Sequence, residues 1–201
     1  MQDYRPGSVI TAVIRSQSNA MQTPGEEFVG EYLRQIRHCE FVQYNLQTTG
    51  EQGEIDVIGI DMSQRRLYVC EVAVHLVTGL QYVKNKRPDN VARFVAKFGK
   101  DIRYARAALP DYEHIFMLWS PIVKNRPNAK NNQMAEVREI HRQLRDEFDI
   151  DLQLVINEHF QKCIVELREY CRNQTQALTS PIARLLQIEE RLTKFLAREN
   201  G

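Results

Sequence analysis

The chain lacks any apolar run that approaches the roughly 20 residues needed to cross a bilayer. It also lacks an excess of charge of either sign, because 27 Lys and Arg residues stand against 26 Asp and Glu residues. The net charge of the whole chain therefore does not indicate whether the protein binds nucleic acid. Only local clusters of basic residues can indicate this. With 201 residues, the chain is long enough for one domain with a substantial core. We expect no membrane contact.

Cysteine is scarce, and no C-x-x-C pair is present. The spacings match no zinc-ligand framework, and the first residues do not form a cleavable signal peptide pattern. These absences favour a reduced, cytoplasmic setting in which the cysteines are core or surface residues. The four are Cys39, Cys70, Cys163 and Cys171.

Residues 1–20 differ from the rest of the chain. They hold one short strand-like run, Ser8 to Ile14, between polar and turn-forming residues. The sequence from Ser18 to Met21 resembles a remnant of an expression vector. We expect residues 1–20 to be a tail or an extra strand, partly vector-derived, without a functional role.

The remaining sequence alternates between helical and extended patterns. A helix is expected from Pro24, followed by a three-stranded antiparallel meander. Five further elements, a helix, a strand, a helix, a strand and a helix, and then a last amphipathic helix complete an α-β-β-β-α-β-α-β-α-α order. This order predicts a mixed sheet covered on both faces by helices. The expected strands are 40–47, 54–60, 66–76, 114–119 and 151–156, the later helices are 91–105, 132–148, 158–172 and one from 181, and the clearest loop is 124–132.

Two carboxylates interrupt the apolar strands of the meander. Asp56 lies among Ile and Val residues on the second strand, and Glu71 lies among apolar residues on the third. An isolated buried acid costs several kcal/mol, so each acid needs a cation, a metal or water access. If the turn at residues 61–64 pairs the strands, the two acids lie close enough for one divalent ion to bridge them. Oxygen ligands of this kind favour Mg²⁺ or Mn²⁺ over Zn²⁺.

A purely structural role is the alternative for these acids. In that interpretation Asp56 and Glu71 pair with Arg65, Arg66 or a basic residue of the following helix.

The motifs from Pro24 to His75 resemble the PD-(D/E)XK nuclease superfamily. They are Pro24-Gly25-Glu26-Glu27 with Tyr32-Leu33, Gln43-Tyr44-Asn45-Leu46, Gly53-Glu54-Ile55-Asp56-Val57-Ile58 and Leu67-Tyr68-Val69-Cys70-Glu71-Val72. The pattern is most similar to YraN-like proteins and archaeal Holliday-junction resolvases, and it covers about a quarter of the chain.

This resemblance implies a restriction endonuclease-like α/β core over residues 21–157, with a C-terminal helical extension, 158–201, packed on the same domain. It also implies that Asp56 and Glu71 are metal ligands and that Glu27, or else Glu31, is the acid of the first helix. Glu54 would be an accessory residue.

The chain departs from the family pattern at Ala73, where the family has a lysine two residues after the strand acid. His75 is the next residue on the same face of the strand, so it is either a replacement base or a residue that caps the strand end. A lysine that has moved to another element is the other option. Lys97 is the first candidate and Lys84 the second.

The stretch after the third strand is locally basic, which is typical of surfaces that contact phosphates and also of solvated helix faces. The expected nucleic-acid-binding residues are Lys84, Lys86, Arg87, Arg93, Lys97 and Lys100.

Three functions remain open at this point. The first is a Mg²⁺-dependent endonuclease that hydrolyses DNA phosphodiester bonds, with Glu27, Asp56, Glu71, Lys97 and His75 as candidate catalytic residues. The second is a catalytically inactive nuclease-fold protein that binds nucleic acid or protein, which Ala73 favours. The third is a structural module in which the C-terminal helices, residues 158–200, mediate oligomerisation. DNA is the expected partner, and a homodimer is compatible with the sequence.

Overall fold

The structure is a computed structural model that describes residues 22–48, 53–84, 87–127 and 132–199. The tail or extra strand expected at residues 1–20 lies outside these ranges, as do residues 128–131 of the expected loop. The helices are α2 (Pro24–Gln35), α3 (Asn90–Ala108), α4 (Gln133–Phe148), α5 (Glu158–Asn173) and α6 (Pro181–Glu199). The strands are β1 (Phe41–Gln47), β2 (Glu54–Asp61), β3 (Arg66–Val72), β4 (Val83–Lys84), β5 (Arg87–Pro88), β6 (Glu113–Ser120) and β7 (Gln153–Ile156).

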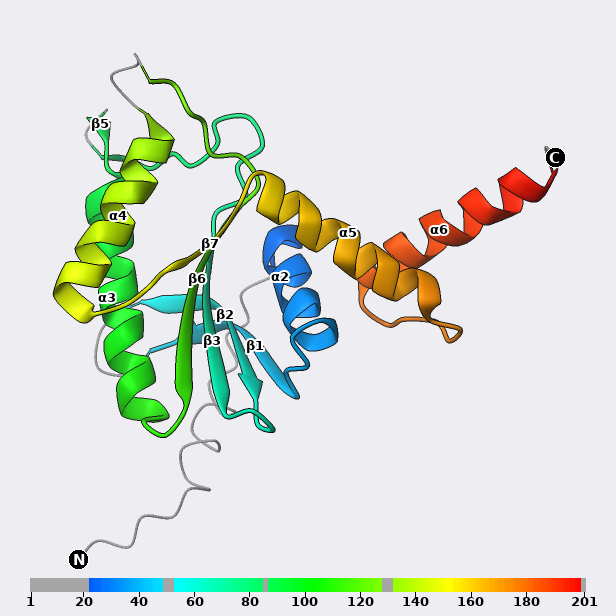
Figure 1. The fold of residues 1–201 in the computed structure, drawn as a ribbon, viewed down its shortest axis with the longest axis horizontal. Coiled ribbons are helices and arrows are strands. Elements are labelled where there is room, and N and C mark those ends of the chain that lie inside the picture. The colour runs from blue at the N-terminus through cyan, green and yellow to red at the C-terminus, as the bar shows by residue number, and fades with distance from the viewer. Residues whose placement is uncertain (1–21, 49–52, 85–86, 128–131, 200–201) are drawn as a thin grey trace, which may run out of the picture.

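The centre of the protein is an open, five-stranded sheet with the order β1-β2-β3-β6-β7. The first three strands form an antiparallel meander, whereas β6 and β7 continue the sheet in parallel with β3. Helices cover both faces (Figure 1). The mixed α/β architecture expected from the sequence is therefore confirmed.

Alternation along the strands creates two separate cores, one on each face of the sheet. Ile58 and Val69 point toward α3 and α4, where they pack with Phe98. Val57 and Cys70 point the other way, toward α2, α5 and the start of α6. The sequence left core and surface roles open for the four cysteines, and the structure buries all of them on this second side.

The strand β3 ends at Val72, earlier than the expected end at Leu76. Beyond it, the Ala73 amide donates to Trp119 O, and the chain then leaves the sheet in a turn closed by the Gly79 amide and His75 O. The short β4–β5 hairpin that follows was not expected, because strands of two residues, one of them containing Pro88, leave no periodic signal.

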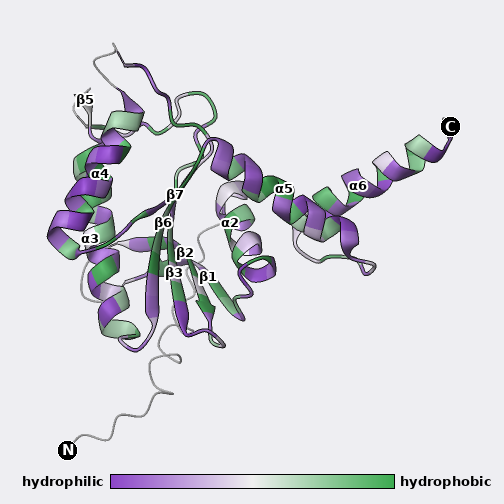
Figure 2. Cartoon of the chain, in the orientation of Figure 1, coloured by the Kyte–Doolittle hydropathy of each residue, from purple (hydrophilic) through white to green (hydrophobic). Residues whose placement is uncertain are grey.

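The helix α6 begins against α2 and α5 and then projects away from the sheet (Figure 1). Hydrophobic and hydrophilic residues alternate along it to its end (Figure 2). In the part of the chain that the structure describes, no helix combines the length and apolarity that a membrane crossing requires.

Candidate functional site

The β2–β3 pairing brings Asp56 and Glu71 to the same face of the sheet. Val57 pairs with Cys70, so Asp56 and Glu71 stand opposite each other one step further along the ladder. The Val72 amide donates to Asp56 Oδ2 at 2.7 Å, which fixes the carboxylate across the end of β3. Both acids face α3, because their neighbours Ile58 and Val69 belong to the core on that side. The sequence-based expectation that the two acids lie close together thus agrees with the structure.

Lys97 reaches both carboxylates from α3. Its Nζ lies 2.7 Å from Asp56 Oδ1 and also contacts Glu71 Oε2. The Lys97 side chain remains 24% exposed, so the ammonium group lies at the boundary between the core and solvent. Burial disfavours its charge, but Glu71 and Asp56 outweigh this effect and raise the pKa of Lys97. The lysine is therefore charged at neutral pH. The alternative interpretation was that Asp56 and Glu71 form a purely structural ion pair with a basic residue of the following helix. The contacts of Lys97 agree with that interpretation and also with a catalytic site.

Asp101 is a third acid of this cluster. It lies one helical turn after Lys97 on α3 and is 1% exposed. Burial raises the pKa of Asp101 to about 6, opposed by a side-chain hydrogen bond with Glu71 and by Lys97. Burial, Asp56 and Asp101 in turn raise the pKa of Glu71 well above its ordinary value.

The carboxyl groups of Glu71 and Asp101 share a hydrogen bond only when one of them is protonated. Glu71 Oε1 and Asp101 Oδ2 are both buried and find no donor among the described residues. A proton on Glu71 or Asp101 would allow the two carboxyl groups to form that hydrogen bond. Three carboxyl groups thus lie near the Lys97 ammonium group, and Lys100 also lowers the pKa of Asp101.

Sequence reasoning missed Asp101, although a signal was present. Asp101 lies beside the apolar positions Phe98, Ile102 and Ala105 on the buried side of α3. An acid on that side of a helix needs a partner, as Asp56 does on its strand.

Tyr82 is a second residue that the sequence did not reveal. Its half-buried ring packs edge-on against Phe94, with centroids 5.3 Å apart, and the Arg93 guanidinium lies 4.2 Å from the ring centroid. Burial raises the pKa of Tyr82, and the charges of Lys97 and Asp56 act on its hydroxyl. Tyr82 is thus a neutral phenol at the rim of the cluster.

A groove of about 590 Å³ leads from solvent to Lys97. One wall is the polar side of α3 and the other is the start of β2. A Cβ atom added to Gly53 would lie 1.9 Å from Lys100 Nζ, so this glycine lets the ammonium group rest on the backbone. Two acids, Glu54 and Asp89, also line it, and the lining residues are Gln47, Gly53, Glu54, Asp89, Ala92, Arg93, Ala96, Lys97 and Lys100.

The structure does not bring Glu27 to this cluster. Glu27 Oε1 instead accepts hydrogen bonds from Ser180 Oγ at 3.3 Å and from the Ile182 amide at 3.4 Å, at the start of α6. Its helix packs on the face of the sheet opposite to Asp56 and Glu71. The expectation that Glu27, Asp56 and Glu71 converge on one site is therefore wrong for Glu27. The sequence could not reveal which face of the sheet α2 covers. Glu31, the alternative acid, pairs with Arg34 on the same helix.

The other predicted residues are distributed around the site. Ala73 is buried on the same face as Glu71. His75 is exposed, and its ring contacts Tyr82 at a centroid distance of 6.0 Å rather than either carboxylate. Lys86 lies outside the described residues, and for Lys84 and Arg87 the structure describes only the backbone of the β4–β5 hairpin.

The carboxylate oxygens of this cluster are of the donor type that a hard divalent cation takes. Mg²⁺ is commonly held by one or two carboxylates, with water and substrate phosphates completing its shell. Asp56 and Glu71 supply such carboxylates, and Glu71 Oε1 is buried without a donor from the described residues. Over the described ranges, no group of three or more His, Cys, Asp or Glu side chains is arranged to hold a metal ion. A divalent cation at this position would therefore have two carboxylate ligands, Asp56 and Glu71, which also contact Lys97.

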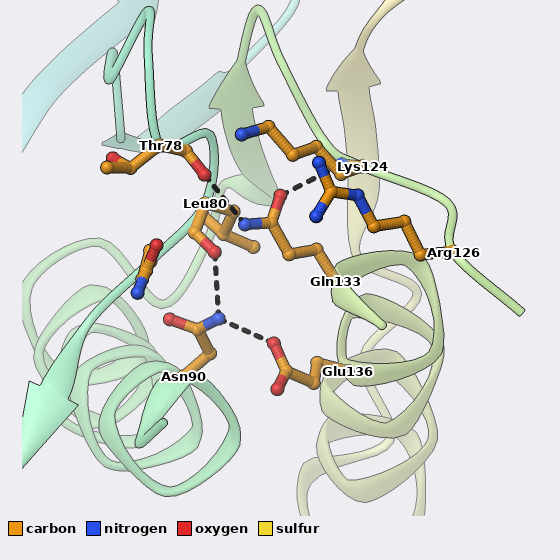
Figure 3. Close-up of a pocket in the computed structure, with 8 residues that line it drawn as sticks. Thr78, Leu80, Asn90, Lys124, Arg126, Gln133 and Glu136 are labelled. Atoms are coloured by element: carbon orange, nitrogen blue, oxygen red, sulfur yellow. Dashed lines mark hydrogen bonds between the residues drawn. The ribbon is translucent and has the colours of Figure 1, made fainter. Parts of the chain in front are cut away.

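A second, smaller pocket of about 240 Å³ lies between the loop after β3 and the first turns of α3 and α4 (Figure 3). The polar groups that line this pocket form hydrogen bonds with one another. Asn90 Nδ2 donates to Leu80 O and Glu136 Oε2, and Gln133 Nε2 donates to Thr78 O. These bonds tie the loop to α3 and α4 and so fix the start of the helix that carries Lys97.

Comparison with known proteins gives no match, whether with family models, with curated proteins or with solved structures. The function therefore has to be inferred from the site itself.

Proposed function

We propose that this protein is a metal-dependent DNA endonuclease that hydrolyses phosphodiester bonds. One observation carries the proposal: Lys97 Nζ contacts both Asp56 and Glu71 from a helix, whereas the strand position for a lysine holds Ala73. Two strand carboxylates with a lysine ammonium between them are the group of side chains that the resemblance to PD-(D/E)XK nucleases implies.

The element order supports the same proposal. Apart from the short β4–β5 hairpin before α3, a helix, a three-stranded meander, a helix, a strand, a helix and a strand follow one another as the resemblance implies for a restriction endonuclease-like core. In such a core Asp56 and Glu71 would lie on adjacent strands, at one end of their shared ladder. Their placement on one face of the sheet is compatible with that role.

Each residue of the site has a chemical role in this proposal. Asp56 and Glu71 would hold Mg²⁺ or Mn²⁺, which when bound supplies an activated water and stabilises charge on the phosphodiester. Lys97 keeps its proton and stabilises the negative charge that develops on a phosphate oxygen. A bound cation would favour the ionised forms of Glu71 and Asp101, because it would supply positive charge beside them.

The groove beside Lys97 supports DNA as the substrate. Arg93, Lys97 and Lys100 follow one another along one side of α3 and line this groove. Basic side chains at such spacing contact phosphates without regard to base sequence. We therefore expect binding that depends on salt and does not depend on sequence.

A catalytically inactive nuclease-fold protein that binds nucleic acid or protein is the second candidate. It is favoured by the burial of Glu71, which is 1% exposed and already paired with Lys97. In that case the ion pair is purely structural, and the groove binds its ligand without cleavage.

A plasmid-nicking assay separates the two functions. Wild-type protein is incubated with supercoiled plasmid in Mg²⁺, in Mn²⁺ and in EDTA, alongside Asp56→Asn, Glu71→Gln and the control Lys162→Ala on α5. A nuclease nicks in either metal, loses at least about 100-fold in rate with each site variant, and keeps its rate with the control. Binding without nicking by folded wild-type protein would reject the nuclease and support the second function.

A further inference from the structure

The helix α6 carries an apolar stripe that faces away from the protein. Leu185, Ile188, Leu192 and Phe195 follow one another at steps of three, four and three residues, and each is between 49% and 63% exposed. This spacing is that of the a and d positions of a coiled coil. The opposite side of α6 holds Ala183, which is buried against the body of the protein. The stripe is therefore additional to the surface that anchors the helix.

The distal part of α6 lies beyond the two cores of the protein, although Arg191 at its start donates to Gln174 O and Thr175 O. Residues 191–199 are all exposed, yet they remain helical to Glu199 (Figures 1 and 2). In proteins, most of the stability of a helix comes from tertiary packing of its apolar face. An exposed extension of this kind, with apolar residues on one side, is typical of a helix that packs against a partner.

We propose that a second copy of this chain covers the stripe, so that two α6 helices pack together in a homodimer. A heptad stripe is self-complementary, and a two-fold axis places the same residues against each other. The four stripe side chains would bury on the order of 700 Å² over two copies, since each is about half exposed. Flanking residues of α6 would bring the interface to the roughly 1,000 Å² that specific association needs.

The charges of α6 favour a second copy over an anionic surface. The helix holds four basic and three acidic residues, so two copies do not repel each other. A helix that lies on a lipid surface is instead strongly basic on its polar face. The basic residues are Arg184, Arg191, Lys194 and Arg198, and the acidic residues are Glu189, Glu190 and Glu199.

The proposal is tested by native mass and is independent of any nuclease activity. Sedimentation equilibrium of the full chain is measured over micromolar concentrations for wild type and for Leu192→Asp/Phe195→Asp. The matched control is Lys194→Asp, which introduces the same acid on the opposite side of the same helix. Fluorescence of the buried Trp119 under urea verifies that each variant stays folded, since α6 projects beyond that core.

We expect the wild type to sediment at twice the mass of one chain. The stripe variant should raise the dimer dissociation constant at least about 100-fold, since each Asp removes apolar burial and places a charge in the interface. The control should leave the dissociation constant within a few-fold of wild type. A wild type that stays monomeric overturns the proposal, because the stripe then has no second copy to cover it. A dimer that the stripe variant leaves intact, or that Lys194→Asp weakens equally, overturns it as well.

Discussion

Replacement of Lys97 by methionine should destabilise the protein by several kcal/mol. The change keeps the length of the side chain and removes the ammonium group that contacts Asp56 and Glu71. Both carboxylates then remain in a mostly buried position without their cation. Removal of one partner from a buried ion pair costs about 3–5 kcal/mol. Because the Lys97 side chain is 24% exposed, we expect the lower end of that range, about 3 kcal/mol, at pH 8.

The cost should decrease at lower pH. Without Lys97 the pKa of Glu71, already raised by burial, moves still higher. When a carboxyl group has a higher pKa in the folded state than in the unfolded state, the protein loses stability as the pH rises toward the pKa of the folded state. As pH falls, Glu71 takes up a proton in the folded variant, which removes one of the two unpaired negative charges. The difference between Lys97→Met and wild type should therefore be smaller at pH 5 than at pH 8.

A double-mutant cycle isolates the pair. Glu71→Gln removes one of the two carboxylates that depend on Lys97, so the double variant should be less destabilised than the sum of the two single variants. We expect a coupling energy of about 2 kcal/mol, which lies within the range for contacting charged residues.

Urea unfolding measured by fluorescence suits this cycle, because the single tryptophan, Trp119, is fully buried between aromatic rings of the core. The control is Arg142→Met on α4. Arg142 also contacts two carboxylates, Glu139 and Asp146, but all three side chains are exposed, so the change should have little effect. A Lys97→Met variant as stable as Arg142→Met, or additive with Glu71→Gln, would refute the buried ion-pair cluster.

Three further predictions concern single residues around the site. Asp101→Asn should stabilise the protein at pH 8, because it removes a carboxyl whose raised pKa of about 6 costs on the order of 2–3 kcal/mol above that pH. The gain should vanish below about pH 4 in urea unfolding, and a gain that does not change with pH would exclude a titrating Asp101. Gly53→Ala should leave stability nearly unchanged, since the added methyl meets only the flexible end of Lys100. It should weaken duplex DNA binding less than Lys100→Ala does, because it displaces the ammonium group and keeps its charge. Lys100→Ala should reduce the salt slope by about one in fluorescence anisotropy, and an unchanged slope in that variant would remove Lys100 from the DNA surface. Glu27→Gln should cost about 0.5–1 kcal/mol in urea unfolding through its contacts at the start of α6 and leave nicking unchanged, whereas a loss of nicking without loss of stability would restore Glu27 to the site.

The sequence predicted the order of the long elements because their apolar periods are regular. As expected, the stripe of α3 packs against the sheet, and the continuous apolar run of β6 forms a buried inner strand of it. By contrast, β4 and β5 contain two residues each, too few for any period to show. The sequence also placed the end of β3 too late. At the observed end, the Val72 amide donates to the Asp56 side chain, a contact that no local sequence pattern reveals.

Strand alternation predicted the carboxylate pair, since pairing across one hairpin fixes which side chains share a face. Lys97 was predicted because a basic residue beside the apolar stripe of α3 could reach that face. The placement of Glu27 failed for a different reason. A helix can cover either face of a sheet, and the face that α2 covers is decided by the apolar contacts of Phe28 and Val29 with β2 and β6.

Relocation of the lysine tests the nuclease proposal most directly. The nicking rate of supercoiled plasmid in Mg²⁺ is compared for wild type, Lys97→Ala and the double variant Lys97→Ala/Ala73→Lys, with urea unfolding of each variant as the check on folding. We expect Lys97→Ala to lose at least about 100-fold in rate and the double variant to recover a substantial part of it, because position 73 lies on the same face as Glu71. Folded Lys97→Ala protein that nicks at the wild-type rate would contradict the proposed role of Lys97.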